Sequence, residues 1–100
     1  MVIKLETKNK KQKLFSGRPL GEALRIQYNL DKLDKGDDII YVEISYKIFS
    51  IDKEFFYGLF GKSIKKLTPI GFNSKYRVVG NHNITKKIGE WTSQAMFAVS

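Results

Sequence analysis

The chain has 100 residues, of which 42% are hydrophobic and 13% aromatic, and it contains no cysteine. This length and apolar content suit one domain over residues 1–100 with a single packed core, and the lack of cysteine excludes disulfides, thiol chemistry and Cys-ligated metal sites. With 18 Lys+Arg against 10 Asp+Glu, the formal net charge of +8 favours anionic partners, such as nucleic acids or acidic proteins.

No membrane or export signal is visible in the sequence. A membrane-spanning helix needs a run of about 18 apolar residues, and the chain has none. Residues 1–6, Met-Val-Ile-Lys-Leu-Glu, lack the basic and apolar stretches of a signal peptide. The expected location is therefore the cytoplasm, with no membrane partner.

The first predicted elements are two strands, at residues 2–7 and 14–15, joined by a basic hairpin loop at about residues 8–13. Pro19 follows Gly17-Arg18 and suits the start of a helix, because proline at the first helical position loses no needed N–H. Apolar residues at helical spacing predict that this helix runs over about residues 19–32.

A central strand is predicted at residues 39–44, which are rich in β-branched side chains. The next helix has a clear start, with Asp52 as N-cap and Ile51 and Phe56 placed as a hydrophobic staple. It is expected to run to about Leu67, before Pro69 and Gly71 break the chain.

The two halves of this helix differ in character. One half is mainly apolar and should face the sheet: Phe55, Phe56, Leu59, Phe60, Ser63, Ile64 and Leu67. The other half should face solvent: Glu54, Gly58, Gly61, Lys62 and Lys65.

The remaining elements are a last strand at residues 76–79, a turn with a capping asparagine at residues 80–83, and a third helix that ends near Met96. The element order is β-β-α-β-α-β-α. The predicted fold class is α/β, with a four-stranded mixed sheet and about three helices packed on it.

Several short motifs along the chain resemble the STAS-like domains grouped as DUF4325. Residues 41–45 and Ile51, followed by Phe-Phe-Tyr-Gly-Leu-Phe-Gly at residues 55–61, are similar to that group's central strand and following helix. Residues 78–84 correspond to its later strand and Asn-rich turn, and Gly17-Arg18 to its helix entrance. The resemblance covers about residues 14–96.

The resemblance implies a mixed sheet with helices on one side and a role as a protein-binding module. Related anti-sigma-factor antagonists dock on a kinase-like ATPase and are switched by phosphorylation of a serine at the start of the helix after the central strand. This chain departs from that pattern, because the corresponding positions carry Asp52, Lys53 and Glu54 and the nearest hydroxyls are those of Ser45 and Ser50. Ordinary helix capping is the favoured interpretation of these acids.

The sequence offers no catalytic, cofactor or metal site. His82 is the only histidine and lies in an asparagine-rich turn, and the carboxylates are scattered. Gly58 and Gly61 form a G-x-x-G pattern inside a helix, without the turn that a phosphate-binding loop requires. We therefore expect a protein that is not an enzyme.

The predicted partner-binding surface follows the start of the second long helix. Glycines on an exposed helix face weaken the helix, so their presence favours the close approach of a partner. The alternative, weighted equally, is that a neighbouring loop or the third helix covers them. The candidate residues are Ser50, Asp52, Lys53, Glu54, Tyr57, Gly58, Gly61, Lys62 and Lys65.

Two other functions stay open. A basic nucleic-acid-binding protein would contact phosphates through lysines and stack bases on Tyr41, Tyr46 or Tyr57, although no known nucleic-acid-binding motif is present. Its candidate residues are Lys8, Lys10, Lys11, Lys13, Lys62, Lys65, Lys66, Lys86 and Lys87. A phage or mobile-element inhibitor that blocks a host protein is the third candidate.

Overall fold

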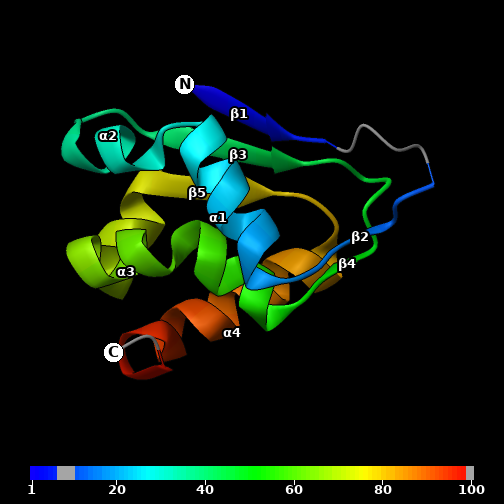
Figure 1. The fold of residues 1–100 in the computed structure, drawn as a ribbon. Helices are drawn as coiled ribbons and strands as arrows, with labels where there is room; N and C mark the ends of the chain where they lie inside the picture. Colours follow the sequence, from blue (N-terminus) through cyan, green and yellow to red (C-terminus); the bar gives the residue numbers. More distant parts are fainter. Residues whose placement is uncertain (7–10, 99–100) are drawn as a thin grey trace.

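Two small parallel sheets carry the strands of the protein, whose computed structural model describes residues 1–6 and 11–98 (Figure 1). The larger sheet has the order β1-β3-β5, with β1 at Val2–Leu5, β3 at Ile40–Ile44 and β5 at Tyr76–Val79. The smaller pairs β2 (Leu14–Phe15) with β4 (Ser50–Ile51). The strand at residues 39–44 is central, as predicted, but a four-stranded mixed sheet is wrong because every pairing is parallel and the strands divide between two sheets.

The predicted hairpin between the first two strands is also wrong. Instead of returning alongside β1, β2 lies parallel to β4, with Phe15 opposite Ile51. The ring of Phe15 is buried and stacks on Phe55 with their centroids 5.0 Å apart, so this apolar contact favours the pairing with β4. Lys8 and Lys10 of the predicted loop lie outside the described residues.

Helices cover only one face of the larger sheet. Ile3, Val42 and Ile44 are buried, whereas their neighbours Tyr41 and Glu43 point to the other face and are exposed. This alternation follows from the period of two along a strand. Parallel sheets are usually covered on both faces, so this one is open to an unusual degree.

The first predicted helix is two helices, α1 (Arg18–Gln27) and α2 (Leu30–Lys35). Gly17 precedes α1 with φ 91°, a conformation that glycine adopts without a Cβ clash. The break comes at Asn29, whose φ of 55° is left-handed; asparagine tolerates this conformation better than most residues.

The long helix α3 (Lys53–Lys75) begins where predicted and has a break at Thr68, before Pro69. Proline disfavours helical geometry in the preceding residue, and Thr68 has a non-helical φ of 67°. The predicted end near Leu67 is therefore the break, but the following residues resume a helix that the sequence did not predict. The last helix, α4 (His82–Ala98), is capped by Asn81, whose side chain accepts a bond from the Ile84 N–H.

Aromatic side chains of α3 form the centre of the core. Phe56, Phe60 and Phe72 are 2% exposed or less, and the ring of Phe60 lies 5.0 Å from that of Phe72 and 5.7 Å from that of Tyr76. These contacts join α3 to β5 and confirm that the apolar half of α3 faces inward. In the described part of the chain, no helix is both long and apolar enough to cross a membrane.

Candidate functional site

The helices α1 and α3 touch through their backbones at two glycines. A Cβ on Gly58 would lie 2.4 Å from the carbonyl oxygen of Arg18, and a Cβ on Gly21 would lie 2.3 Å from that of Phe55. Both glycines, and Gly61 as well, are buried. The prediction that Gly58 and Gly61 face solvent is therefore wrong, and α1 packs on the side of α3 that carries Gly58.

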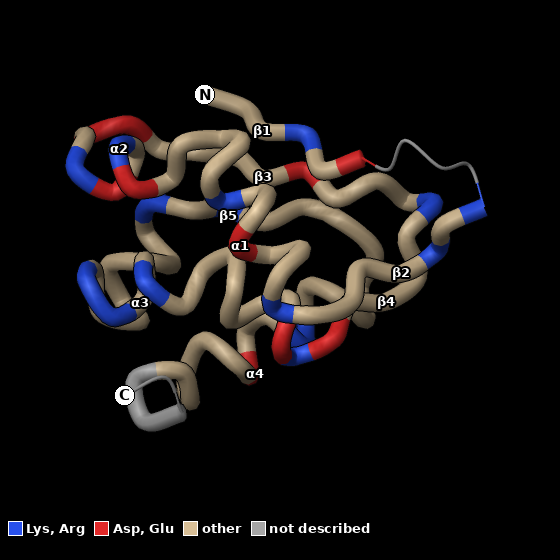
Figure 2. Tube along the Cα trace, viewed as in Figure 1, with Lys and Arg blue, Asp and Glu red and all other residues tan. Residues whose placement is uncertain are grey.

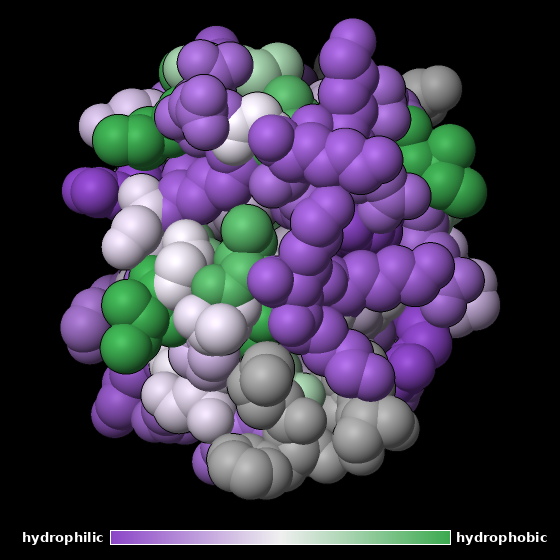
Figure 3. Space-filling view, turned by 90° about the vertical axis from the view of Figure 1, so that its left-hand side faces the viewer, coloured by the Kyte–Doolittle hydropathy of each residue, from purple (hydrophilic) through white to green (hydrophobic). Residues whose placement is uncertain are grey.

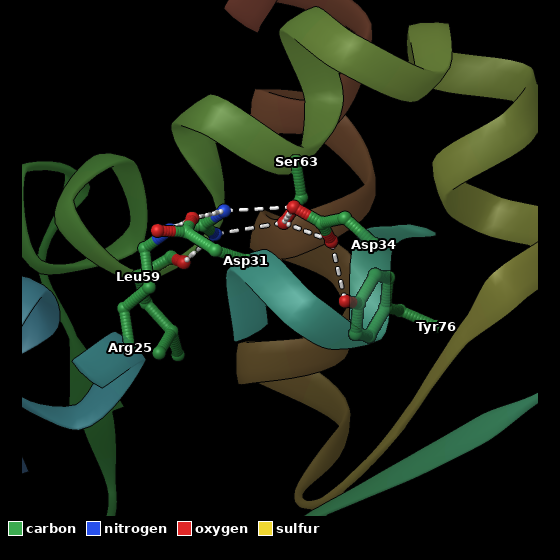
Figure 4. A network of polar contacts seen from close by, with 6 residues as sticks. All are labelled: Arg25, Asp31, Asp34, Leu59, Ser63 and Tyr76. Atoms are coloured by element: carbon green, nitrogen blue, oxygen red, sulfur yellow. Dashed lines mark hydrogen bonds and ion pairs between the residues drawn. The ribbon is translucent and has the colours of Figure 1, made fainter. Parts of the chain in front are cut away.

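An arginine in α1 is buried beside this contact and uses all five of its N–H donors (Figure 4). Arg25 donates to the exposed carboxylate of Asp31 from Nε and Nη2, and to the buried carboxylate of Asp34 from Nη2 at 2.7 Å. Its Nη1 donates to the Leu59 carbonyl at 3.0 Å and to the Ser63 hydroxyl at 2.8 Å. The guanidinium thus joins α1, α2 and α3.

Asp34 is the buried acceptor of the same network. Ser63 donates to its carboxylate at 2.8 Å and Tyr76 of β5 donates at 2.5 Å. Burial, and then the bond to Asp34, raise the pKa of Tyr76, so the phenol remains protonated. In contrast, the hydrogen bond and the charge of Arg25 lower the pKa of Asp31. The residues of this network were not predicted from the sequence, although Ser63 on an otherwise apolar helix face was a signal for it.

The start of α3 is bound to the loop before α1 through Asp52. Its carboxylate accepts from the Phe55 N–H at 2.8 Å, from the Ser16 hydroxyl at 2.5 Å and from the Gly17 N–H at 3.1 Å. Burial alone would raise the pKa of Asp52, but the bonds from Ser16, Phe55 and Gly17 outweigh it and lower the pKa. The capping interpretation of Asp52 is confirmed.

A shallow cleft of about 170 Å³ opens on the surface between α1 and α3. We call it the α1–α3 cleft. It is smaller than the usual pocket for a cofactor or drug-sized ligand, which holds about 300 Å³ or more, so it suits a single side chain. Its lining residues are Arg18, Glu22, Arg25, Ile26, Asp31, Tyr57, Gly58 and Lys62.

Tyr57 is the most unusual residue of the cleft. It is 7% exposed, and its hydroxyl has no hydrogen-bond partner among the described residues. The guanidinium carbon of Arg18 and the Nζ of Lys53 each lie 5.9 Å from the centre of its ring. Buried hydroxyls are nearly always satisfied, so this unsatisfied one, on a ring with two cations near it, is a candidate contact point for a partner.

The other predicted binding residues lie around the cleft or beyond it. Ser50, Lys53 and Glu54 are exposed near the start of α3, and Glu54 pairs with Arg18 at 2.8 Å. Lys62 lies in the cleft, whereas Lys65 and Lys66 are exposed on the next turn of α3.

The basic residues do not form one patch. Lys86 and Lys87 are exposed on α4, and Lys11 and Lys13 are exposed before β2. Figure 2 shows blue segments on α2 and α3 with red segments interspersed on α2. Figure 3 shows a broad hydrophilic area on the side of α2 and the broken end of α3, next to a smaller apolar patch. Tyr41 and Tyr46 are exposed, but Tyr57 is too deeply buried to stack on a base.

A second depression, of about 360 Å³, lies at the carboxyl ends of β1 and β3. Ligands of open parallel sheets often bind at such an edge. However, the side chains of Lys4, Glu6, Glu43 and Tyr46 are exposed and not held in place by burial, and the half-buried Ser45 already accepts from the Lys47 N–H. Among the described residues, no group of three His, Cys, Asp or Glu side chains is arranged to hold a metal ion, and His82 is exposed.

Comparison of the chain with models of known protein families, with curated proteins and with solved structures gives no match. The resemblance to STAS-like domains therefore stays a prediction that depends on the short motifs in the sequence.

Proposed function

We propose that the protein is a non-enzymatic regulatory module that binds another protein at the α1–α3 cleft. The unsatisfied, buried hydroxyl of Tyr57 is the observation that carries this proposal. The hydroxyl is covered in the free protein, so an acceptor of a partner would reach it only as the surrounding side chains shift, and it would then remove the cost of an unpartnered buried group.

The cleft favours an acidic side chain of the partner. Three cations line the cleft, Arg18, Arg25 and Lys62, against two acids, Glu22 and Asp31, and Lys53 lies with Arg18 over the ring of Tyr57. The net charge of +8 would also accelerate the approach of an acidic surface. Ile26, which is 80% exposed at the rim, offers an apolar contact beside these charges. Tyrosine and arginine are enriched among the residues that contribute most to protein interfaces.

The network below the cleft supports the same proposal. Arg25 and Asp34 fix α1 and α2 against α3, so the cleft exists before a partner arrives. A preformed site loses less conformational entropy on binding than a mobile one.

The test begins with capture of binding proteins from a lysate of the source cells, with and without nuclease and high salt. The captured protein is then purified and its affinity measured by calorimetry. A kinase-like ATPase is the first candidate, because of the STAS-like motifs. Tyr57→Phe should weaken binding without loss of stability, since it removes a hydroxyl that has no partner.

Two further variants separate the cleft from the rest of the surface. Ile26→Arg should weaken binding by about tenfold or more, whereas Ile70→Arg is the matched control, because Ile70 is 82% exposed but lies beyond the break in α3. Equal affinities for the three variants and the wild type would refute the cleft as the binding site. Recovery of nucleic acid alone, released by salt or nuclease, would favour the nucleic-acid function instead.

A further inference from the structure

A groove that is separate from the α1–α3 cleft lies between the edge strand β5 and α4. Its volume is about 270 Å³. One wall consists of residues 76–78 of β5, the other of Thr85, Ile88 and Gly89 of α4, and the end of α3 closes it at Phe72 and Asn73.

The backbone of β5 is available on the side away from β3. Because the sheet order is β1-β3-β5, β5 pairs with one neighbour only. In a strand, successive residues direct their N–H and C=O groups to alternate sides, so part of the β5 backbone faces away from β3. Among the described residues, no backbone bond of residues 77–79 is formed outside the ladder with β3.

Gly89 keeps the groove open. It lies inside α4, where glycine is the poorest helix former apart from proline. Packing does not explain its presence, because a Cβ built on Gly89 would have no atom within 4 Å. This contrasts with Gly58, which α1 contacts directly. Since Gly89 lines the groove, a side chain there would occupy space that a ligand could use.

The charge around the groove selects the ligand. None of its lining residues is acidic, and Arg77 lies in the β5 wall. Two more cations, Lys86 and Lys87, are exposed on α4 beside the lining residues Thr85 and Ile88, and one acid, Glu90, follows Gly89. These cations outnumber the acid, so an acidic ligand meets a net favourable charge.

We propose that this groove binds an extended, acidic segment of a partner protein, which adds to the sheet as a strand beside β5. The partner's backbone would pair with the free edge of β5, its apolar side chains would contact Val78 and Ile88, and an acidic side chain would pair with Arg77. Strand addition between a sheet edge and a helix is an established way to recognise extended peptides. This inference does not depend on the α1–α3 cleft.

The test uses a display library of random peptides of about 10 residues, long enough for one strand, selected against the intact wild-type protein. The expected sequences carry Asp or Glu and β-branched residues and lack proline in the middle. Bound peptide should shift the NMR signals of Arg77, Val78 and Gly89 and slow amide exchange on β5. A library that yields no binder, or binders that shift signals elsewhere, would overturn the inference.

Two variants test the geometry and the charge. Gly89→Leu should fold normally, fill the groove and weaken the selected peptides by about tenfold or more. The matched control is Gln94→Leu, which places a leucine on an exposed position of α4 outside the groove and should not change the affinity. Arg77→Glu should weaken acidic peptides, and replacement of their acids by lysine should restore binding.

A further variant distinguishes this site from the one in the proposed function. Lys62→Glu changes the α1–α3 cleft and should leave the affinity of the selected peptides unchanged. If Lys62→Glu weakens them and Gly89→Leu does not, the groove inference fails and the cleft is the binding site. If neither variant changes the affinity of the peptides, they bind elsewhere and the groove inference also fails.

Discussion

The contact between α1 and α3 and the groove between β5 and α4 both contain a glycine inside a helix, but the two glycines have opposite surroundings. Gly58 lies against the backbone of α1, where a Cβ would approach the Arg18 oxygen to 2.4 Å, whereas a Cβ on Gly89 would have no atom within 4 Å. The first glycine is required for packing; packing gives no reason for the second. A helix glycine in the sequence therefore does not by itself indicate a close approach, and only the fold shows whether a neighbouring element lies against it.

The largest loss of stability is expected from Asp34→Ala, in the network beside the α1–α3 contact. This variant removes the buried partner of Arg25 and an acceptor of Ser63 and Tyr76, and breaking a buried ion pair typically costs about 3–5 kcal/mol. Urea unfolding measures the loss. Asp31→Ala is the matched control, because the Asp31 side chain is 74% exposed and such pairs contribute little. Equal losses for the two variants would contradict a structural role for the buried network.

The second prediction compares a glycine-to-alanine substitution at the α1–α3 contact with the same substitution in the groove. Gly58→Ala should lower the free energy of unfolding by about 2–3 kcal/mol, because α1 must move away from α3. Gly89→Ala should raise it by up to about 1 kcal/mol, because alanine favours the helix and meets no neighbour. Chemical denaturation of both variants and the wild type checks the signs. Loss of stability in Gly89→Ala would show that the groove lacks the open space described here.

The sequence predicted elements with a strong local signal. The central strand at about residues 39–44, the Asp52 cap and a capping asparagine in the turn at residues 80–83 depend on neighbouring residues. The structure has the strand at Ile40–Ile44, the cap at Asp52, and Asn81 as the capping asparagine. Pairing between segments that are far apart in the sequence was harder to predict. From the sequence, the two residues of β2 could pair equally well with β1 or with β4. The stacking of Phe15 on Phe55 favours β4, and it is a contact between residues far apart in the sequence.

The candidate site was only partly predictable for the same reason. Its position near the start of α3 followed from local charge and glycine content, but Gly58 was wrongly assigned to solvent, because its burial depends on the packing of α1. Arg25 and Asp34 resemble ordinary surface charges when each is considered alone. Ser63 was the one local signal, since a polar residue on an apolar helix face needs a buried partner.

The smallest effect concerns Asp52, which binds the entrance of α1 to the start of α3. Because its pKa in the folded protein lies below the ordinary 3.8, the unfolded chain takes up a proton first as the pH falls. The stabilisation by Asp52 is thus complete above about pH 5 and is lost as the pH falls through the folded-state pKa.

The variant Asp52→Asn isolates this contribution, because asparagine still caps the helix but carries no charge. Near neutral pH it should be less stable than the wild type by less than about 1 kcal/mol, given the exposure of the site. Denaturation at decreasing pH should narrow that difference, while the other carboxylates affect both proteins equally. Ser16→Ala, which removes one donor to Asp52, should reduce the same pH dependence by part of that amount. A difference that stays constant from neutral pH to below the ordinary pKa would mean that the ionised carboxylate does not hold the two elements together.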